Sequence, residues 1–210
     1  MGGYTLVENL FIQPTPAGCY YALSTPSKSP ERLLLRALLH QDPTPALDLD
    51  ALRTWSTLDD PEQGLSLLHR AQSLRWVQGF HEPRKCPDQP LETLLPRLLH
   101  SFSNQGKALL ADHQGFYLTS SGFPHEVAEE LSALSADLAN LHERRVGVLQ
   151  HNMGLNSSAF AIVDSAGNSR LGFWPLYIGE LRFVLVINGM PHLNHPDFVT
   201  LTWLLSRRYT

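Results

Sequence analysis

The sequence predicts an α+β protein in which a small part, residues 1–80, precedes a larger α/β/α sandwich over residues 91–210. Three observations carry this prediction. The proline-rich polar segment 81–90 has no apolar period and is typical of a linker. Beyond it, apolar residues alternate between helical and strand spacing, in the order helix, two strands, helix, three strands, helix. The run 183–187 is apolar without polar alternation, which indicates a strand covered on both faces.

The first part is predicted to contain a short strand near Cys19–Ser24, three helices and a final strand over 74–80. Helices are expected to begin at Pro30, after Asp48, and after Asp59 or Asp60, because proline suits a first turn and aspartate caps one. Three short helices followed by a strand is the order of a winged helix. The run LLHRAQSLRWVQGF in particular resembles the end of a winged-helix third helix that continues into its wing.

In the second part, a helix is expected over 91–102, with Pro96 marking either a kink or the true start. The tetrapeptides 112–115 and 165–168 both have the composition of hairpin turns. A last helix is expected to begin near Pro196.

A long helix is predicted from about His125 to Leu149, and its apolar residues recur at alternating spacings of four and three, which is a heptad seam. This seam consists of Val127, Leu131, Leu134, Leu138 and Leu141, and alanines at 128, 133, 136 and 139 flank it. In one interpretation the leucines cover the sheet of the same chain and the alanines contact a second subunit. In the other, the helix has a single stripe that faces its own core.

With this element order, residues 91–208 resemble the roadblock / dynein light-chain family, through the segments KALLADHQGFYLTSSGF, EVAEELSALSADL and GLNSSAFAIVDSAGNSRLGFWPLYIGELRFVLVINGMPHLNHPDFVTLTWLL. The resemblance implies a roadblock-type sandwich: a five-stranded antiparallel sheet with the long helix on one face and the two terminal helices on the other. It also implies a dimer paired through segments 126–149 and 158–164. The expected interface residues are Val127, Leu131, Leu134, Leu138, Leu141, Ala159, Phe160, Ala161 and Ile162.

Members of this family regulate small Ras-like GTPases or serve as adaptor subunits. The partners implied are therefore the chain itself in a homodimer, another roadblock subunit, or a small Ras-like GTPase. The sequence departs from the family in its N-terminal extension of about 90 residues and in the pair Arg144-Arg145 at the end of the long helix.

Four residues outside the seam are candidate partner contacts. Arg144 and Arg145 have the chemistry to bind an acidic partner or a nucleotide phosphate, although complementing the helix dipole is the more common role of such a pair. Trp174 and Tyr177 belong to an aromatic cluster that either anchors a partner or packs beneath a terminal helix.

The sequence contains no arrangement that indicates catalysis, a metal or a cofactor. Neither a Walker loop nor a G-x-G-x-x-G motif is present, and no serine lies in a nucleophile elbow. His192, His195 and Asp197 have ligand-like spacing, yet they also fit a turn leading into a helix. Cys19 and Cys86 are too few for a disulfide framework, which favours a reducing cytoplasmic setting, and no segment is apolar enough for a membrane span.

The formal net charge of −4 disfavours nucleic acid as a partner. Two functions follow as hypotheses. The favoured one is a non-catalytic dimeric adaptor or GTPase regulator, with the first part as a second protein-docking surface. The alternative is a winged-helix transcriptional regulator whose second part dimerises or senses a signal, although Glu62 at the start of the third helix would repel DNA phosphates.

Overall fold

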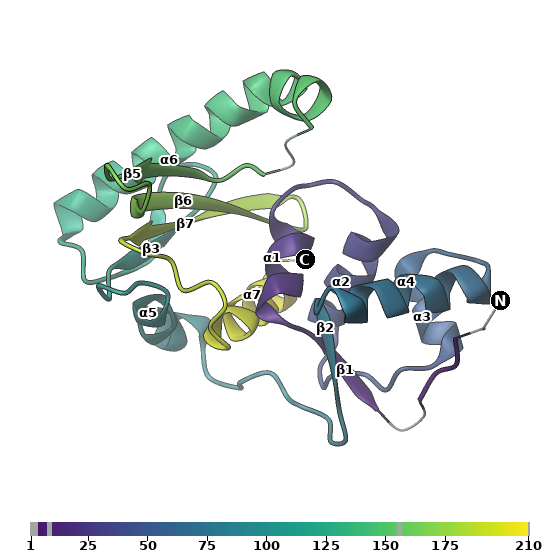
Figure 1. The fold of residues 1–210 in the computed structure, drawn as a ribbon. Helices are drawn as coiled ribbons and strands as arrows, with labels where there is room; N and C mark the ends of the chain where they lie inside the picture. Colours follow the sequence, from purple (N-terminus) through teal and green to yellow (C-terminus); the bar gives the residue numbers. More distant parts are fainter. Residues whose placement is uncertain (1–3, 8–9, 155–156, 210) are drawn as a thin grey trace.

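A computed structural model describes residues 4–7, 10–154 and 157–209 of the chain. The elements before residue 81 are β1 (Phe11–Pro14), α1 (Pro16–Leu23), α2 (Pro30–His40), α3 (Leu49–Ser56), α4 (Pro61–Ser73) and β2 (Val77–Phe80). Strand β2 pairs antiparallel with β1, with Phe80 opposite Phe11. Figure 1 shows the helices α2, α3 and α4 grouped at the N-terminal end of the molecule.

The predicted strand near Cys19–Ser24 is wrong, because this segment belongs to helix α1. The Thr15 side chain accepts a hydrogen bond from the Gly18 N–H at 3.2 Å, and Pro16 occupies the first turn. This capped start overrides the strand-like appearance of the apolar residues that follow. The first strand of this part is β1, which precedes α1 in the chain.

The other three helices begin where their capping residues predict. Ser29 accepts a hydrogen bond from the Arg32 N–H, Asp48 from Ala51, and Asp60 from Glu62. Each side chain satisfies a backbone donor that has no partner within the first helical turn.

The second part contains α5 (Leu91–Ser101), β3 (Ala108–Ala111), β4 (Tyr117–Ser121), α6 (His125–Val146), a π-helical turn (Gly147–Asn152), β5 (Phe160–Val163), β6 (Ser169–Ile178), β7 (Leu181–Asn188) and α7 (Asp197–Arg208). The predicted element order is confirmed. Helix α5 runs through Pro96, so this proline does not mark the start of the helix.

The five strands form an antiparallel sheet in the order β4-β3-β7-β6-β5. Strand β7 is central and all its residues from Arg182 to Ile187 are buried, which confirms the prediction of a strand covered on both faces. Both predicted hairpin turns are closed by aspartate. Asp112 accepts hydrogen bonds from Gln114 and Phe116 N–H, and Asp164 accepts them from Ala166 and Asn168 N–H.

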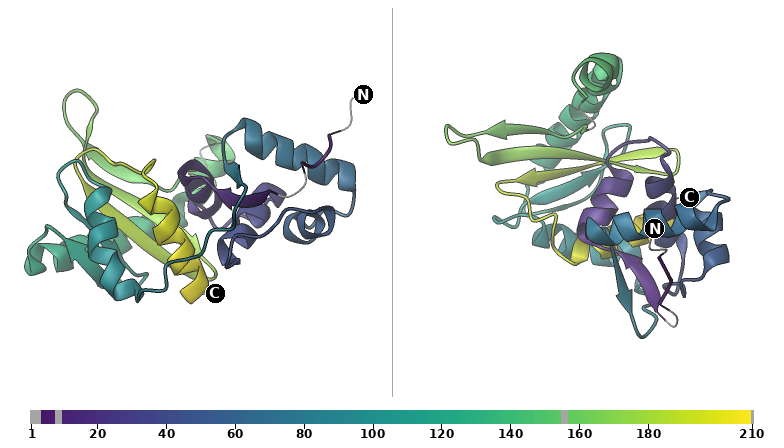
Figure 2. Two further views of the ribbon diagram at one scale, coloured as in Figure 1. Left: turned by 90° about the horizontal axis from the view of Figure 1, so that it is seen from below. Right: turned by 45° about the vertical axis from the view of Figure 1, so that its right-hand side comes forward.

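Helices cover both faces of this sheet, as predicted (Figure 1). Helix α6 lies on one face, over a cluster that includes Leu109, Phe173, Val184 and Val186. Helices α5 and α7 lie on the other face, over a larger cluster that includes Leu185 and residues of all four N-terminal helices. The two views in Figure 2 show the β5–β6 hairpin projecting beyond the body of the sheet.

Helices α1 and α2 join the N-terminal part to the side of the sheet opposite α6. Helix α1 contacts β6 and α7, and α2 contacts α7. Residues 81–90 contain no helix or strand and run along the N-terminal part, where Thr44 exchanges hydrogen bonds with the Arg84 backbone and Asp42 accepts one from the Cys86 N–H. Among the described residues, no helix combines the length and the apolar character that crossing a membrane requires.

A close approach at Gly18 leads to the first prediction. A Cβ atom there would lie 1.9 Å from the Trp76 carbonyl oxygen, whereas one at Gly64 would meet only the Leu52 side chain at 3.4 Å. We expect Gly18→Ala to lower the free energy of unfolding by about 2 kcal/mol, because the clash is with backbone. The matched control Gly64→Ala, also in a helix, should leave it unchanged or raise it by up to about 1 kcal/mol. Urea denaturation measures both, and equal effects would contradict the prediction.

Candidate protein-interaction surface

Helix α6 packs on the sheet through small side chains. Ala128, Ser132, Ser135, Ala136 and Ala139 are buried against it. The two serine hydroxyls donate to carbonyls of their own helix at 2.7 Å, so they need no partner from the sheet. The interpretation in which the leucines cover the sheet and the alanines face a second subunit is therefore wrong. The small residues allow α6 to lie close to the sheet, and this places the large residues beside the contact.

The large residues of α6 form a stripe that no part of the described chain covers completely. Val127, Leu134, Leu141 and Val148 recur every seven residues and are 38%, 40%, 43% and 50% exposed. Leu131 and Leu138 lie between them and are half-buried, because they also pack on the cluster beneath α6. We call these six residues the α6 seam.

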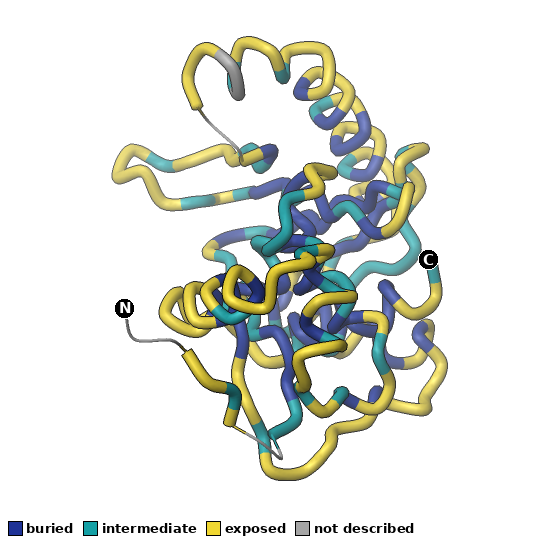
Figure 3. The backbone as a smooth tube through the Cα atoms, turned by 90° about the vertical axis from the view of Figure 1, so that its right-hand side faces the viewer, coloured by how far each residue is buried: buried dark blue, intermediate teal, exposed yellow. Residues whose placement is uncertain are grey.

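Strand β5 adds an open edge to the sheet. It pairs with β6 and has no second neighbour among the described strands, so it is an edge strand. Ala159 and Phe160 are half-buried, and Ala161 is exposed. Ile162 and Val163 are 57% and 54% exposed. The edge therefore offers backbone hydrogen-bonding groups beside apolar side chains. Figure 3 colours the hairpin that contains β5 mostly as exposed or intermediate.

The seam and the edge lie on the same side of the molecule. The His142 ring, on the seam side of the buried stripe of α6, stacks edge-to-face on Phe160 of β5 with centroids 5.9 Å apart. Leu138 of the seam and Leu171 of β6, which is opposite Ile162, pack on one cluster. We call the α6 seam together with Phe160–Val163 the docking surface.

The C-terminal half of α6 is held on the sheet by polar contacts. The buried Arg182 guanidinium, from β7, forms an ion pair with Glu143 and donates to the Asn140 side chain at 3.1 Å. Nearby, burial raises the pKa of the Tyr177 hydroxyl. Because a buried guanidinium without its partners is costly, these contacts fix the position of α6 and with it the direction of the seam.

The four candidate partner contacts occupy three different environments. Arg144 and Arg145 are exposed at the end of α6. Trp174 lies on the opposite face of β6 from Tyr177 and packs edge-to-face on Tyr20 at 6.0 Å. Tyr177 lines a cavity with His142 and Ser158 beneath the end of α6. The two arginines are therefore exposed on the helix that carries the seam, whereas Trp174 packs within the chain.

The other predicted candidates form no assembled site. His195 lies 3.7 Å from Asp197 and accepts a hydrogen bond from its N–H, as expected for a turn before a helix. No group of three or more metal-binding side chains occurs within the described part of the chain. Burial raises the pKa of the Cys19 thiol to about 12, so this thiol is unreactive.

The sequence-based interface omitted three residues that the structure places in or beside the docking surface. Val148 follows Leu141 by seven residues, so extending the heptad would have found it. Val163 follows the predicted Ile162, and including every residue of the predicted strand in the interface would have found it. His142 carries no sequence signal, since its contact with Phe160 depends on how α6 crosses the sheet.

Comparisons with known proteins find partial structural similarity only. No model of a protein family matches the chain, and no curated protein matches it in sequence. The Roadblock/LC7 domain from Streptomyces avermitilis is similar over 49% of this chain and 81% of its own, with 13% identity and a TM-score of 0.33. MglB from Myxococcus xanthus is similar over 56% of this chain and 88% of its own, with 18% identity and a TM-score of 0.32.

The buried His142 makes the fold sensitive to acid. Burial lowers its pKa below the ordinary 6.5, and its Nδ1 has no hydrogen-bond partner among the described residues. Burial also lowers the pKa of His40. Below about pH 6.5 the unfolded chain therefore binds more protons at these two histidines than the folded chain does. Their contribution to the free energy of unfolding is complete above about pH 6.5, and it is lost as the pH falls from there toward the folded-state pKa.

We therefore expect the free energy of unfolding to decrease between about pH 7.5 and pH 5.5, and to decrease less in His142→Gln. Urea denaturation across this range measures both, with values at about pH 8 as the reference at which the histidines are neutral in both states. A wild-type value that stays constant, or an equal decrease in His142→Gln, would contradict this assignment.

Proposed function

We propose that this chain is a cytoplasmic, non-catalytic adaptor or regulatory protein that works as a roadblock-type dimer through its docking surface. The observation that carries the proposal is the α6 seam: four exposed apolar residues at seven-residue spacing, next to an open sheet edge. A stripe of this kind is typical of a helix that meets another helix. The two free, buried cysteines fit a reducing compartment.

The energetics favour covering this surface. Full burial of a leucine or valine side chain contributes about 1.5–3 kcal/mol, so each seam residue that is about half exposed has about 1 kcal/mol left to gain. Two protomers contribute two seams, and strand pairing at β5 would add backbone hydrogen bonds. A micromolar dimer requires a net free energy of about 8 kcal/mol, after the cost of association, so burial of the two seams would supply part of the gain and strand pairing would add to it.

A small Ras-like GTPase is the proposed further partner, and the support for it is the resemblance of residues 91–208 to the roadblock family. The helix and strand order implied by that resemblance is the order that the fold has. The exposed Arg144 and Arg145 lie beside the α6 seam, where a composite surface of two protomers would contain them twice.

The alternative is a transcriptional regulator with a winged-helix-like first part, residues 1–80, separated by a linker, 81–90, from residues 91–210. Helix α4 would be its DNA-reading element. Its exposed side chains include Glu62 and Gln63, its His69 stacks on Tyr4 at 4.3 Å, and its Arg70 lies 3.5 Å from Glu31. Because this face carries little free positive charge, we favour a role of the first part in protein contact.

The dimer is tested by placing charge in the seam. We expect Leu134→Asp/Leu141→Asp to weaken self-association about 100-fold or more, because the carboxylates would be buried between the helices. Light scattering after size exclusion, over a range of protein concentrations, measures this. Leu49→Asp is the matched control, since Leu49 is 46% exposed on α3, away from the seam. A wild-type protein that stays monomeric in the micromolar range, or a loss of association in both variants, would contradict the proposal.

The partner class is tested with purified proteins. A panel of small Ras-like GTPases loaded with GDP or a GTP analogue should include one that binds in a nucleotide-dependent way and loses binding in Arg144→Ala/Arg145→Ala. A salt-dependent shift of duplex DNA, with no GTPase bound, would instead favour the transcriptional regulator.

A further inference from the structure

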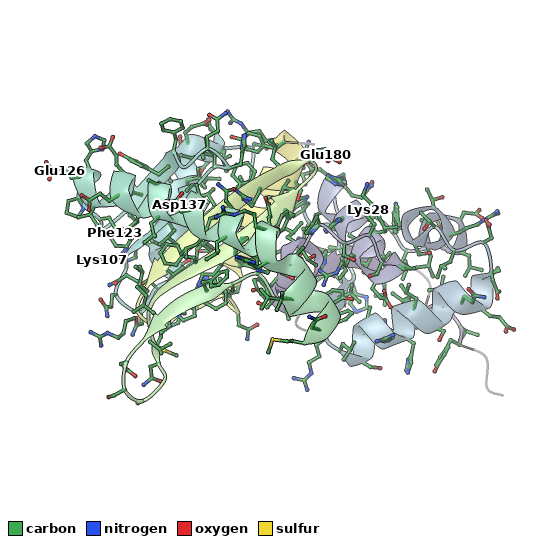
Figure 4. The ribbon with its side chains drawn as sticks, turned by 90° about the horizontal axis from the view of Figure 1, so that it is seen from above. Lys28, Lys107, Phe123, Glu126, Asp137 and Glu180 are labelled. Atoms are coloured by element: carbon green, nitrogen blue, oxygen red, sulfur yellow. The ribbon has the colours of Figure 1, made fainter. Side chains whose placement is uncertain are left out.

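A cavity of about 450 Å³ lies where the first part of the chain meets the end of α6. Four segments that are far apart in the sequence supply its wall: the α1–α2 loop at 25–27, the last turns of α6 at 142–146, residue 158 before β5, and residue 177 of β6. Figure 4 shows Lys28 and Glu180, which are close in sequence to two of these segments, on the side of the molecule away from Glu126. Junctions between parts of a chain are common places for small-molecule sites, and the volume is in their range.

The wall of this cavity contains polar residues that are almost completely buried. Thr25 and Ser158 are each 4% exposed, and His142 is 5% exposed. Burial of a polar group costs free energy unless the group is hydrogen-bonded. The Ser158 hydroxyl donates to the Ser24 carbonyl at 2.9 Å, but the His142 Nδ1 has no hydrogen-bond partner among the described residues. Hydrogen-bonding capacity that the fold does not use, beside a cavity, is typical of a binding site.

The hydrogen-bonding groups in the wall are mostly uncharged at neutral pH. Burial lowers the pKa of the His142 imidazole and raises the pKa of the Tyr177 hydroxyl, so the first is neutral and the second keeps its proton. Of the described residues that line the cavity, only Glu143 carries a charge, and it is paired with Arg182. A charged ligand would therefore be buried without a free counter-charge, which is costly.

The same wall also has an apolar part, formed by Pro26 and Val146. We propose that the cavity binds a small uncharged molecule that combines an apolar ring with hydroxyl or amide groups. Its ring would pack on Pro26 and Val146, and its polar groups would hydrogen-bond with the Tyr177 hydroxyl and the His142 imidazole. This binding site is a function additional to protein docking.

The cavity adjoins the docking surface through one residue. The His142 ring lines the cavity and also contacts Phe160 of β5. A bound molecule would therefore lie one side chain away from the open edge of the sheet. Because residues of a single chain form the wall, the inference does not depend on the proposed dimer.

Three probes of nearly one size and shape test the class of ligand. At about pH 7.5, 4-hydroxybenzamide is uncharged, 4-hydroxybenzoate is an anion and 4-hydroxybenzylamine is a cation. We expect the amide to bind at least about 10-fold more tightly than either charged probe, because only the charged probes lose hydration without gaining a counter-charge. Titration of the ¹⁵N-labelled chain by NMR measures each affinity, and the shifted signals should belong to the segments that form the wall.

Variants of the wall test the location. Tyr177→Phe removes one hydroxyl and keeps the ring, so it should weaken binding of 4-hydroxybenzamide about 10-fold. The matched control is Tyr209→Phe, since Tyr209 follows α7 and packs on Phe183, and it should bind as wild type does. Ser27 is exposed at the edge of the cavity, so Ser27→Trp should fill the entrance and abolish binding without changing the thermal unfolding temperature.

Several outcomes would overturn the inference. Equal affinities for the three probes would show that the cavity does not select against charge. Shifts outside the wall, or normal binding by Ser27→Trp, would show that the probe binds elsewhere. Failure of all three probes to bind at about 10 mM would remove the site altogether. A chain that stays monomeric but binds the amide as described would contradict the proposed dimer and leave this inference intact.

Discussion

The contact between α6 and the sheet determines most of what the rest of the structure can do. Alanines and serines fill this contact, so the helix lies close to β3 and β7. The leucines lie beside the contact, on the side of α6 that faces β5, where Leu131 and Leu138 are half-buried against the cluster beneath the helix and Leu134 and Leu141 are exposed. An exposed apolar stripe is in this way a direct result of close packing elsewhere on the same helix.

The rest of the chain covers the face of the sheet that lies opposite α6. Helices α1, α2, α5 and α7 bury the opposite face of the sheet in a single hydrophobic cluster that extends from Ile12 to Leu205. The buried ion pair of Arg182 with Glu143 then holds α6 in place, which makes the free side a defined surface.

Local sequence signals predicted much of this fold. The element order, the two aspartate turns at Asp112 and Asp164, and the central strand β7 follow from spacing, capping and turn chemistry within a few residues. Helix α1 was missed because its apolar residues look like a strand, while Thr15 and Pro16 had set a helical start.

The candidate surface was only partly predictable for a different reason. The heptad in α6 contains two adjacent stripes, one large and one small, and spacing alone does not decide which of them faces the sheet. That choice depends on how closely the helix approaches β3 and β7, which is a tertiary property. The contact of His142 with Phe160 depends on the same crossing and leaves no local trace.

The open edge of β5 has a consequence beyond recognition. An edge strand with exposed Ile162 and Val163 is also a template on which unrelated strands can add, and the polar turn at Asp164–Asn168 protects only its end. In the proposed dimer, a protomer that has not yet met its partner is therefore exposed to aggregation. Prompt assembly would then act as a form of quality control during synthesis, coupling the solubility of each new chain to its concentration in the cell.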